Sequence, residues 1–487
     1  MGIEKISGHS VFLESRSLAA ASNRLGETSR AARATGDTRD ATAIEIMKKG
    51  FYWIMAAQFF SSLADNALLI ASIALLLQLQ APGWMTPLLK FFFTVSYVVL
   101  APFVGAFADS MMKGRVMFIT NLVKVVGLML MLASVHPLLA YGVVGLGAAA
   151  YSPAKYGILT ELLPPQQLVA ANGWIEGTTV GSIILGTVFG GFLVSQMASR
   201  YLLGLPGLAH LGINTAAEAA LGVIVFVYII AALCNLKIPD TGARYPHQTA
   251  NPAKQLVEFI HCTKVLWTDK LGQISMAVTT LFWGAGATLQ FIVIKWAEYA
   301  LGLDLSKAAT LQATVAFGVA AGAILAATRV PLKKSLTVLP MGMGMGILCM
   351  VLSLYTRSLV PDLQFSVGSL HLPLYLVLAG MFMVAIGAMA GYFVVPMNAL
   401  LQHRGYVLLS AGHSIAVQNF NENVSVLVML SVYALLIKLN LHIQWIIGLF
   451  GVFVVGTMWL VMQWNKRNMR ERDWTQIIGE PRHESGH

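Results

Sequence analysis

Long apolar stretches of membrane-spanning length, separated by short polar loops, constrain the fold of this chain more than any other feature of its sequence. A helix needs about 20 apolar residues to cross a bilayer, whereas a membrane-spanning strand needs only about 10. In hydrocarbon, backbone N–H and C=O groups must be satisfied within the protein, so only helices and closed barrels span a membrane. These runs are too long for barrel strands, and the sequence therefore predicts an all-α integral membrane protein.

The composition excludes an ordinary soluble protein. Of the 487 residues, 57% are hydrophobic and only 11% are charged, and the mean hydropathy is +0.70. A soluble domain carries about 25% charged residues, which it needs to cover its surface. The net charge of +10 is spread over short clusters between apolar runs, which is typical of the loops of a membrane protein and does not indicate a nucleic-acid partner.

The apolar runs fall into two groups of six, which predicts twelve transmembrane helices in two six-helix bundles. We predict a disordered polar cytoplasmic leader over residues 1–49, bundles over 50–236 and 273–464, a cytoplasmic linker over 237–272, and a basic cytoplasmic tail over 465–487. The linker is expected to hold a short surface helix near 252–266. The spans are expected to begin near Phe51, Pro87, Val116, Leu138, Asn172, Ala217, Gln273, Lys307, Leu336, Leu372, Ala411 and Ile443.

The distribution of lysine and arginine predicts the orientation. These residues concentrate in the loops on the side of the leader, and those on the other side are Arg200, Lys307, Arg357 and Lys438. Because cytoplasmic loops are enriched in basic residues, we expect both termini in the cytoplasm.

The two predicted bundles resemble each other in one helix. Pro153 ends the small-residue run 147–153 of the fourth span, and Pro396 ends the similar run 390–396 of the tenth. Prolines at corresponding positions of two halves point to a hinge or a binding site at their interface. Chance similarity between two helices rich in small residues is the alternative.

The loop after the second span carries a motif that indicates a gate. The segment 105–115 (GAFADSMMKGR) resembles the cytoplasmic signature of the major facilitator superfamily, although its second glycine falls two residues late. Asp109, at a helix end beside Lys113 and Arg115, can pair across helices and latch one face shut. The corresponding loop 322–334 keeps basic residues but has no acidic one, so a latch on that side must work differently.

Charged and amide side chains inside the predicted spans are the candidates for substrate binding. A charge in the bilayer costs about 2.5–3.5 kcal/mol on insertion scales, so each one suggests a function. The candidates are Asp65, Asn66, Lys124, Lys155, Glu176, Gln290, Lys295, Gln418, Asn419 and Glu422.

Three interpretations of these charges remain open. They can pair with one another to hold helices in register, for example Asp65 with a lysine of the other half, or a carboxylate can couple transport to protons. They can also bind a polar headgroup, because lysines suit a phosphate and carboxylates suit an ammonium group. Lys295, Glu298 and Lys155 lie near predicted helix ends, where a long side chain reaches the interface, so Asp65, Glu176 and Glu422 are the stronger candidates for buried charges.

Nothing in the sequence predicts a soluble-enzyme site, a metal site or a cofactor. The three cysteines, Cys234, Cys262 and Cys349, have no metal-ligand spacing and are interpreted as packing residues. His403 and His413 are interpreted as solvated or packing residues. No P-loop is present to couple ATP hydrolysis.

Several strings of this sequence resemble the bacterial lysophospholipid transporter family, a branch of the major facilitator superfamily. They are DNALL at 65–69, APFVG at 101–105, KGRV at 113–116, GAAAYSPAKYGIL at 147–159, ANG at 171–173 followed by Glu176, LFWGAG at 281–286, FVVPMNALLQ at 393–402, and IAVQN at 415–419 followed by Glu422. The resemblance covers residues 58–464.

The resemblance implies a flippase-like carrier in the bacterial inner membrane, and we hypothesise that it acts by alternating access of its two halves. Members of the family bring lysophosphatidylethanolamine and lysophosphatidylglycerol from the outer to the inner leaflet, where a partner acyltransferase/acyl-carrier-protein synthetase re-acylates them. We expect a monomer. The alternatives are a proton-coupled exporter of amphipathic drugs and a membrane scaffold for an acyltransferase. One position departs from the family: Gln290 stands where we expect an arginine, and Lys295 is the candidate to replace that charge.

Overall fold

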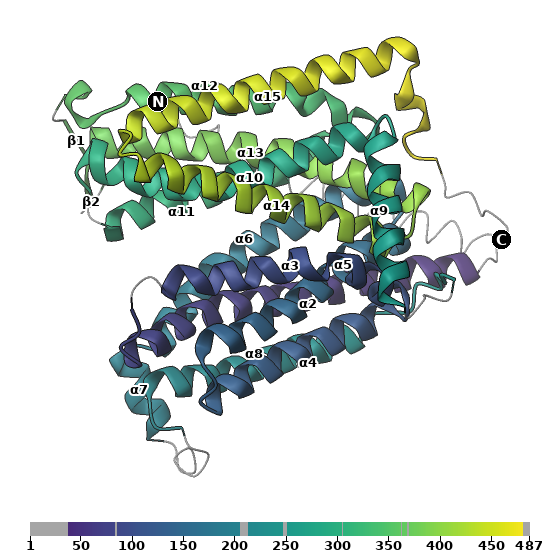
Figure 1. The fold of residues 1–487 in the computed structure, drawn as a ribbon, viewed down its shortest axis with the longest axis horizontal. Helices are drawn as coiled ribbons and strands as arrows, with labels where there is room; N and C mark the ends of the chain where they lie inside the picture. Colours follow the sequence, from purple (N-terminus) through teal and green to yellow (C-terminus); the bar gives the residue numbers. More distant parts are fainter. Residues whose placement is uncertain are drawn as a thin grey trace, which may run out of the picture.

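The computed structural model describes residues 38–82, 85–204, 213–246, 251–303, 305–361, 363–367 and 370–480. Its long helices run roughly parallel in two groups, one from each half of the chain (Figure 1). The first group holds α2 (Thr38–Gln78), α3 (Met85–Asp109), α4 (Lys113–Leu132), α5 (Pro137–Leu162), α6 (Leu168–Leu193), the short α7 (Gln196–Leu203) and α8 (Ala216–Leu236). The second holds α10 (Gly272–Leu301), α11 (Leu305–Arg329), α12 (Leu339–Leu354), α13 (Leu374–Leu408), α14 (Ala411–Lys438) and α15 (Ile443–Glu471).

Ten of the helices in the described residues are long and apolar enough to cross a membrane. The fold is therefore that of a multi-pass helical membrane protein, as predicted. The ten do not include α5, which has 26 residues and packs on α3 and α4, or α11, whose apolar part is the 17-residue segment Ala313–Arg329. The count of twelve spans stays a prediction.

Most helices begin close to the expected residues. The helices α14 and α15 start at the predicted Ala411 and Ile443, and α8 and α10 each start one residue before the prediction. The predicted surface helix of the linker is α9 (Pro252–Thr268), which crosses the ends of the long helices at one end of the molecule (Figure 1). Short 3-10 turns, η1 (Pro165–Gln167), η3 (Leu332–Val338), η4 (Arg357–Leu359) and η5 (Trp474–Ile477), complete the connections.

The predicted leader is too long at its C-terminal end. Residues 38–49 were expected to be disordered, but α2 begins at Thr38 and includes them. Most of these residues are good helix formers, such as alanine, glutamate, methionine and lysine, so the apolar helix extends into them. Residues 1–37 lie outside the described residues.

A two-stranded hairpin departs from the all-α prediction. Strands β1 (Gln364–Val367) and β2 (Leu370–Pro373) pair antiparallel between α12 and α13, with Gln364 opposite Pro373. The signal lies in the sequence, where two alternating runs flank a Gly-Ser dipeptide, which favours a two-residue hairpin loop. The span was expected to begin near Leu372, but Leu372 and Pro373 belong to β2, and α13 begins at Leu374.

Glycines allow α11 and α13 to pack closely. A Cβ atom added to Gly322 of α11 would overlap the backbone of Ala388 in α13, and one added to Gly391 of α13 would overlap the backbone of Val319 in α11. Small residues at helix contacts let backbones approach, and in a bilayer such van der Waals packing is a main source of helix association. The α11–α13 pair therefore depends on its glycines.

We expect Gly322→Ala to lower the stability of the protein. The added methyl group forces the two backbones apart, and overpacking of this kind costs about 1–3 kcal/mol. The measurement is the apparent melting temperature of the detergent-purified protein. Gly456→Ala in α15 is the matched control, because no atom lies within 4 Å of a Cβ added there. Equal melting temperatures for the two variants would contradict the close packing of α11 and α13.

Candidate functional site

The carboxylate of Asp109 joins the two halves at one end of the molecule. Asp109 is the last residue of α3 and is buried. Its Oδ1 accepts a hydrogen bond of 3.0 Å from the backbone N–H of Gly412, and its Oδ2 accepts one from the hydroxyl of Ser410 and lies 3.1 Å from Nδ1 of His413. These groups form the N-terminus of α14, where free N–H groups and the helix dipole favour a negative charge.

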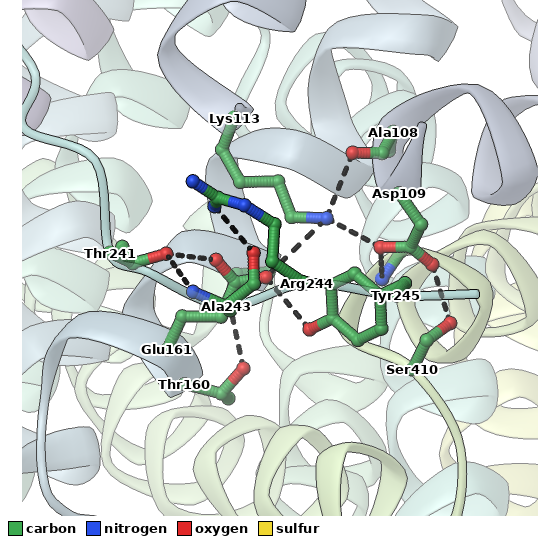
Figure 2. Close-up of polar contacts among 12 residues, drawn as sticks. Ala108, Asp109, Lys113, Thr160, Glu161, Thr241, Ala243, Arg244, Tyr245 and Ser410 are labelled. Carbon is green, nitrogen blue, oxygen red and sulfur yellow. Dashed lines mark hydrogen bonds and ion pairs between the residues drawn. The ribbon is translucent and has the colours of Figure 1, made fainter. Parts of the chain in front are cut away.

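The first half supplies a second set of contacts beside Asp109 (Figure 2). Lys113, at the start of α4, pairs with Asp109, donates to the backbone oxygen of Ala108 over 2.8 Å, and lies 3.4 Å from the carboxylate of Glu161 at the end of α5. Lys113 is buried, so these acceptors replace the water that its ammonium loses. The predicted latch of Asp109 and Lys113 thus gains Glu161 as a third member.

The linker closes over this cluster. The hydroxyl groups of Thr241 and Tyr245 each donate to Glu161 over 2.8 Å, and the ammonium of Lys113 lies 4.9 Å from the centre of the Tyr245 ring. Burial and the neighbouring carboxylate of Glu161 raise the pKa of Tyr245. Outside the cluster, Arg244 forms an exposed ion pair with Asp240. The hydrogen bonds that Asp240 accepts from Arg244 and from the backbone N–H of Gly242 lower the pKa of Asp240 to about 2.

Further contacts between the halves lie on the same end of the helices. The side-chain amides of Asn172, near the start of α6, and Gln402, near the end of α13, bond to each other reciprocally at 2.8 and 2.9 Å. The amide of Asn419 in α14 donates to the hydroxyl of Ser152 in α5 over 2.9 Å. Gly105 of α3 lies against the backbone of His413, so closely that a Cβ would stand 2.9 Å from its Cα. The halves are closed at the Asp109 end.

The remaining predicted gating residues are placed differently. Arg115 is exposed, two residues beyond Lys113. Pro153 and Pro396 are buried inside α5 and α13, and neither helix is interrupted there. Proline has no N–H, so each leaves one carbonyl of the preceding turn without its helical partner.

An ion pair between a buried lysine and a partly buried aspartate lies within the first half. The ammonium of Lys124 in α4 is 2.9 Å from each carboxylate oxygen of Asp65 in α2 and donates to Ser61 over 3.0 Å. The hydroxyl of Tyr228 in α8 donates to the same carboxylate over 2.5 Å. The rings of Tyr151 and Tyr228 lie 5.0 and 5.5 Å from the Lys124 ammonium. Asp65 therefore pairs with a lysine of its own half, and the suggested pairing with the other half is wrong.

A second charged group lies where the halves meet. Glu176 of α6 and Glu422 of α14 are buried, and their charges, with those of Lys124 and Asp65, reach Lys155 of α5. Glu176 accepts a hydrogen bond of 3.4 Å from Tyr156, and Glu422 accepts one of 2.7 Å from Gln418. In the described part of the chain, the ammonium of Lys155 makes no hydrogen bond or ion pair; it lies 4.1 Å from the centre of the Tyr156 ring.

Other predicted binding residues do not join this group. Lys295 forms a 2.9 Å pair with Glu298, and their side chains are 57% and 43% exposed. Gln290 is also exposed. Lys295 therefore does not replace a buried arginine charge. The other interpretation, a lysine near a helix end whose side chain reaches the membrane interface, agrees better with its exposure. Asn66 caps a turn of its own helix by donating to the Ser62 carbonyl over 2.8 Å.

Several residues of the site were missed or misjudged in the sequence. His413 and His403 were interpreted as solvated or packing residues, but both are buried and bonded. His413 contacts Asp109, and Nε2 of His403 accepts a hydrogen bond of 2.9 Å from the N–H of Gly479. The spacing Ser410-x-x-His413 at a helix start was the available signal, because Ser410 caps α14. No sequence motif marked Glu161, because its partners Lys113, Thr241 and Tyr245 lie far from it in the sequence.

Comparisons with known proteins agree with this geometry. Residues 54–428 match the family model of the Major Facilitator Superfamily. The lysophospholipid transporter LplT of Yersinia enterocolitica is 40% identical over 82% of this chain and 90% of that protein, and the LplT of Yersinia pestis is 40% identical over 81% and 88%.

Solved structures share the fold. The fucose:proton symporter FucP in an outward conformation covers 85% of this chain and 98% of its own, with a TM-score of 0.62 and 13% identity. A bacterial homologue of the iron transporter ferroportin in an outward-facing state covers 86% of this chain and 100% of its own, with a TM-score of 0.61 and 11% identity.

The fold and its paired bundles define the class of a multi-pass membrane transporter rather than that of an enzyme. Within that class, the chain belongs to the lysophospholipid transporter family of the Major Facilitator Superfamily.

We expect Asp109→Asn to open the closed end of the molecule. The neutral amide loses the charge-assisted bonds to α14, which are worth about 1.5–3 kcal/mol, so the open population should rise at least about tenfold. Spin labels at Met111→Cys and Leu408→Cys, both exposed, report the distance between the halves. Asp240→Asn, which breaks an exposed pair, is the control and should leave the distances unchanged. Identical distance distributions for both variants would show that Asp109 does not hold the halves together.

We expect Lys124→Gln, but not Lys155→Gln, to lower the stability of the protein. Breaking the pair leaves the partly buried Asp65 without its partner and costs up to about 3 kcal/mol, whereas Lys155 has no hydrogen bond or ion pair to lose among the described residues. The apparent melting temperature should fall for Lys124→Gln and stay level or rise for Lys155→Gln. Adding Asp65→Asn to Lys124→Gln should restore part of the loss. A lower melting temperature for Lys155→Gln than for Lys124→Gln would contradict the prediction, because Lys155 and not Lys124 would then be the lysine that stabilises the fold.

Proposed function

We propose that this protein carries lysophospholipids, chiefly lysophosphatidylethanolamine and lysophosphatidylglycerol, from the outer to the inner leaflet of the bacterial inner membrane. The proposal starts from its family, whose relatives with 40% identity are named lysophospholipid transporters. It makes this chain a flippase-like carrier and not a soluble-solute transporter.

The observation that carries the proposal is the ammonium of Lys155, which makes no hydrogen bond or ion pair among the described residues and lies within electrostatic reach of two buried carboxylates, Glu176 of the first half and Glu422 of the second. A lysine suits a phosphate as a mobile point charge. The carboxylates suit the ammonium group of an ethanolamine headgroup. For a glycerol headgroup, the amides of Gln418 and Asn419 supply donors and acceptors for its hydroxyl groups.

The ion pair of Asp65 and Lys124 has a different role in this proposal. Its two charges compensate each other inside the first half, together with Tyr228 and Ser61. We assign it to holding α2, α4 and α8 in register, with Asn66 on the adjoining turn of α2. Binding of the headgroup phosphate then falls to Lys155.

Transport proceeds by alternating access between two six-helix halves. We place both termini in the cytoplasm, with α5 and α11 as the spans that complete twelve. The Asp109 end is then the cytoplasmic end, and the closed latch corresponds to a state that faces outward. Opening requires the N-terminus of α14 to leave Asp109, and Pro153 and Pro396 are the hinges in corresponding helices.

The acyl chain stays in lipid while the headgroup crosses. Withdrawing a long chain into water would cost about 0.8 kcal/mol per CH₂, more than a few headgroup contacts offset. The substrate therefore enters sideways between spans. Re-acylation on the inner face by a partner acyltransferase/acyl-carrier-protein synthetase removes the product and drives net flow, with the transporter acting as a monomer.

We expect Lys155→Gln to abolish most inward movement of labelled lysophosphatidylethanolamine in proteoliposomes. Loss of a charged hydrogen bond to phosphate costs about 1.5–3 kcal/mol, so uptake at low substrate should fall at least about tenfold. Lys295→Gln is the matched control, because that lysine is exposed and paired with Glu298. Uptake is measured with and without a proton gradient.

The outcomes separate the alternatives. Gradient-independent uptake that fails only with Lys155→Gln supports a facilitative headgroup carrier. Transport that needs a gradient and ignores the glycerophosphate headgroup would instead identify an exporter of amphipathic drugs. Unchanged uptake with both Lys155→Gln and Asp65→Asn would refute headgroup binding by these charges, and no uptake by any form would favour a scaffold.

A further inference from the structure

The linker helix α9 is fastened to the membrane-spanning helices along one face. Phe259, Cys262 and Leu266 are buried against a cluster that includes Ala101 of α3 and Val417 of α14. The Phe259 ring packs edge-on against Phe420 of α14 at a centroid distance of 5.4 Å. The helix is therefore a fixed part of the fold.

Its contacts place α9 beside the ends of the spans rather than beyond them. The indole N–H of Trp267 donates to Asn421 over 3.2 Å. Because α14 begins at Ala411, Asn421 is about ten residues, or about 15 Å, along that helix. On the other side, Ala101 lies eight residues before the end of α3 at Asp109. With α3 ending at Asp109 and α14 beginning at Ala411, this is the level at which we expect the bilayer interface.

The outward face of α9 is amphipathic. Leu256, Val257 and Ile260 are 47%, 67% and 59% exposed, and with the exposed Ala253 they follow the i, i+3, i+4, i+7 spacing of one helix face. Exposed polar residues lie beside this stripe: Lys254, Glu258, His261, Lys264 and Thr268. An apolar stripe this exposed, next to a basic polar face, is typical of helices that lie in a membrane interface.

The two faces of α9 meet along one edge of the helix. Ala253 and Val257 lie there beside Lys254, Glu258 and His261 on an open surface. Apolar residues therefore adjoin a lysine and a histidine, which offers an anionic lipid both hydrocarbon contact and a cation.

We propose that α9 is an interfacial anchor whose stripe of Ala253, Leu256, Val257 and Ile260 inserts into the adjoining leaflet while Lys254 and Lys264 bind anionic lipid headgroups. The occupant of this surface is thus the bilayer itself. Lysines near a membrane surface are attracted by anionic lipids, and the surrounding linker is also basic, with Lys237 exposed nearby in the sequence. Assignment to the inner leaflet rests on the orientation proposed above, but the insertion does not.

Insertion is tested with the full-length protein in nanodiscs of phosphatidylcholine with or without phosphatidylglycerol. An environment-sensitive fluorophore is attached at Ile260→Cys, and His261→Cys serves as the matched control because it is exposed on the polar side, one residue away. The native cysteines do not compete: all three are buried, and burial raises the pKa of the Cys262 thiol to about 12. Quenching is measured with doxyl-labelled lipid and with aqueous iodide.

We expect lipid-borne quencher to act at least about threefold more strongly on the probe at Ile260→Cys than on the probe at His261→Cys, with the reverse order for iodide. Phosphatidylglycerol should increase the lipid quenching, and Lys254→Glu with Lys264→Glu should remove that increase. Equal access of iodide to both probes would overturn the proposal, because the stripe would then face water. A probe at Ile260→Cys that neither quencher reaches would overturn it too, since a protein surface would then cover the stripe. Nanodiscs expose both leaflets, so neither result depends on transport or orientation.

Discussion

The structure depends on a carboxylate placed at the start of a helix from the other half of the chain. Asp109 is buried, and a buried charge is tolerated only when other groups replace its lost water. Gly412, Ser410 and His413 do so from α14, and Lys113 does so from α4. Because these donors come from both halves, the charge is fully compensated only while the halves touch. The closed end is therefore specified by electrostatics as well as by the close packing of Gly105 and Gly412.

The charges within the spans divide into two kinds by their surroundings. Lys124 is compensated by Asp65 inside one half, so its pair persists when the halves move relative to each other. Lys155 and Glu176 come from α5 and α6 of the first half and Glu422 from α14 of the second, so the position of Glu422 relative to the other two changes when the halves move. In the proposed function, a ligand with both a phosphate and an ammonium group would bind the second kind and leave the pair of Asp65 and Lys124 in place. The proposal thus assigns stability of the bundle and substrate binding to different charges.

Much of the fold could be predicted from the sequence because the bilayer permits so few structures. Apolar run length located the starts of α14 and α15 to the residue, and α9 was expected almost at its observed bounds. The hairpin of β1 and β2 was missed because a span was expected to begin near Leu372, inside the second strand. The partners of Asp65 and the member Glu161 could not be predicted, since residue type reveals that a buried charge needs a partner but not which of several lies within reach. Lys295 shows the same limit, because its exposure depends on which face of α10 packs inward.

The linker belongs to the machinery of the closed end and does more than connect the two halves. Its first part is held to the first half, where Thr241 and Tyr245 bond to Glu161 beside Lys113. Its last part is held to the second half, where Asp269 pairs with Arg404 at 2.7 Å. The side chain of Glu258, midway along α9, lies 3.8 Å from His413, which also contacts Asp109. Separation of the halves must therefore alter contacts of the linker as well as those of Asp109. A membrane-anchored α9 would tie this rearrangement to the bilayer, the same phase from which a lipid substrate arrives.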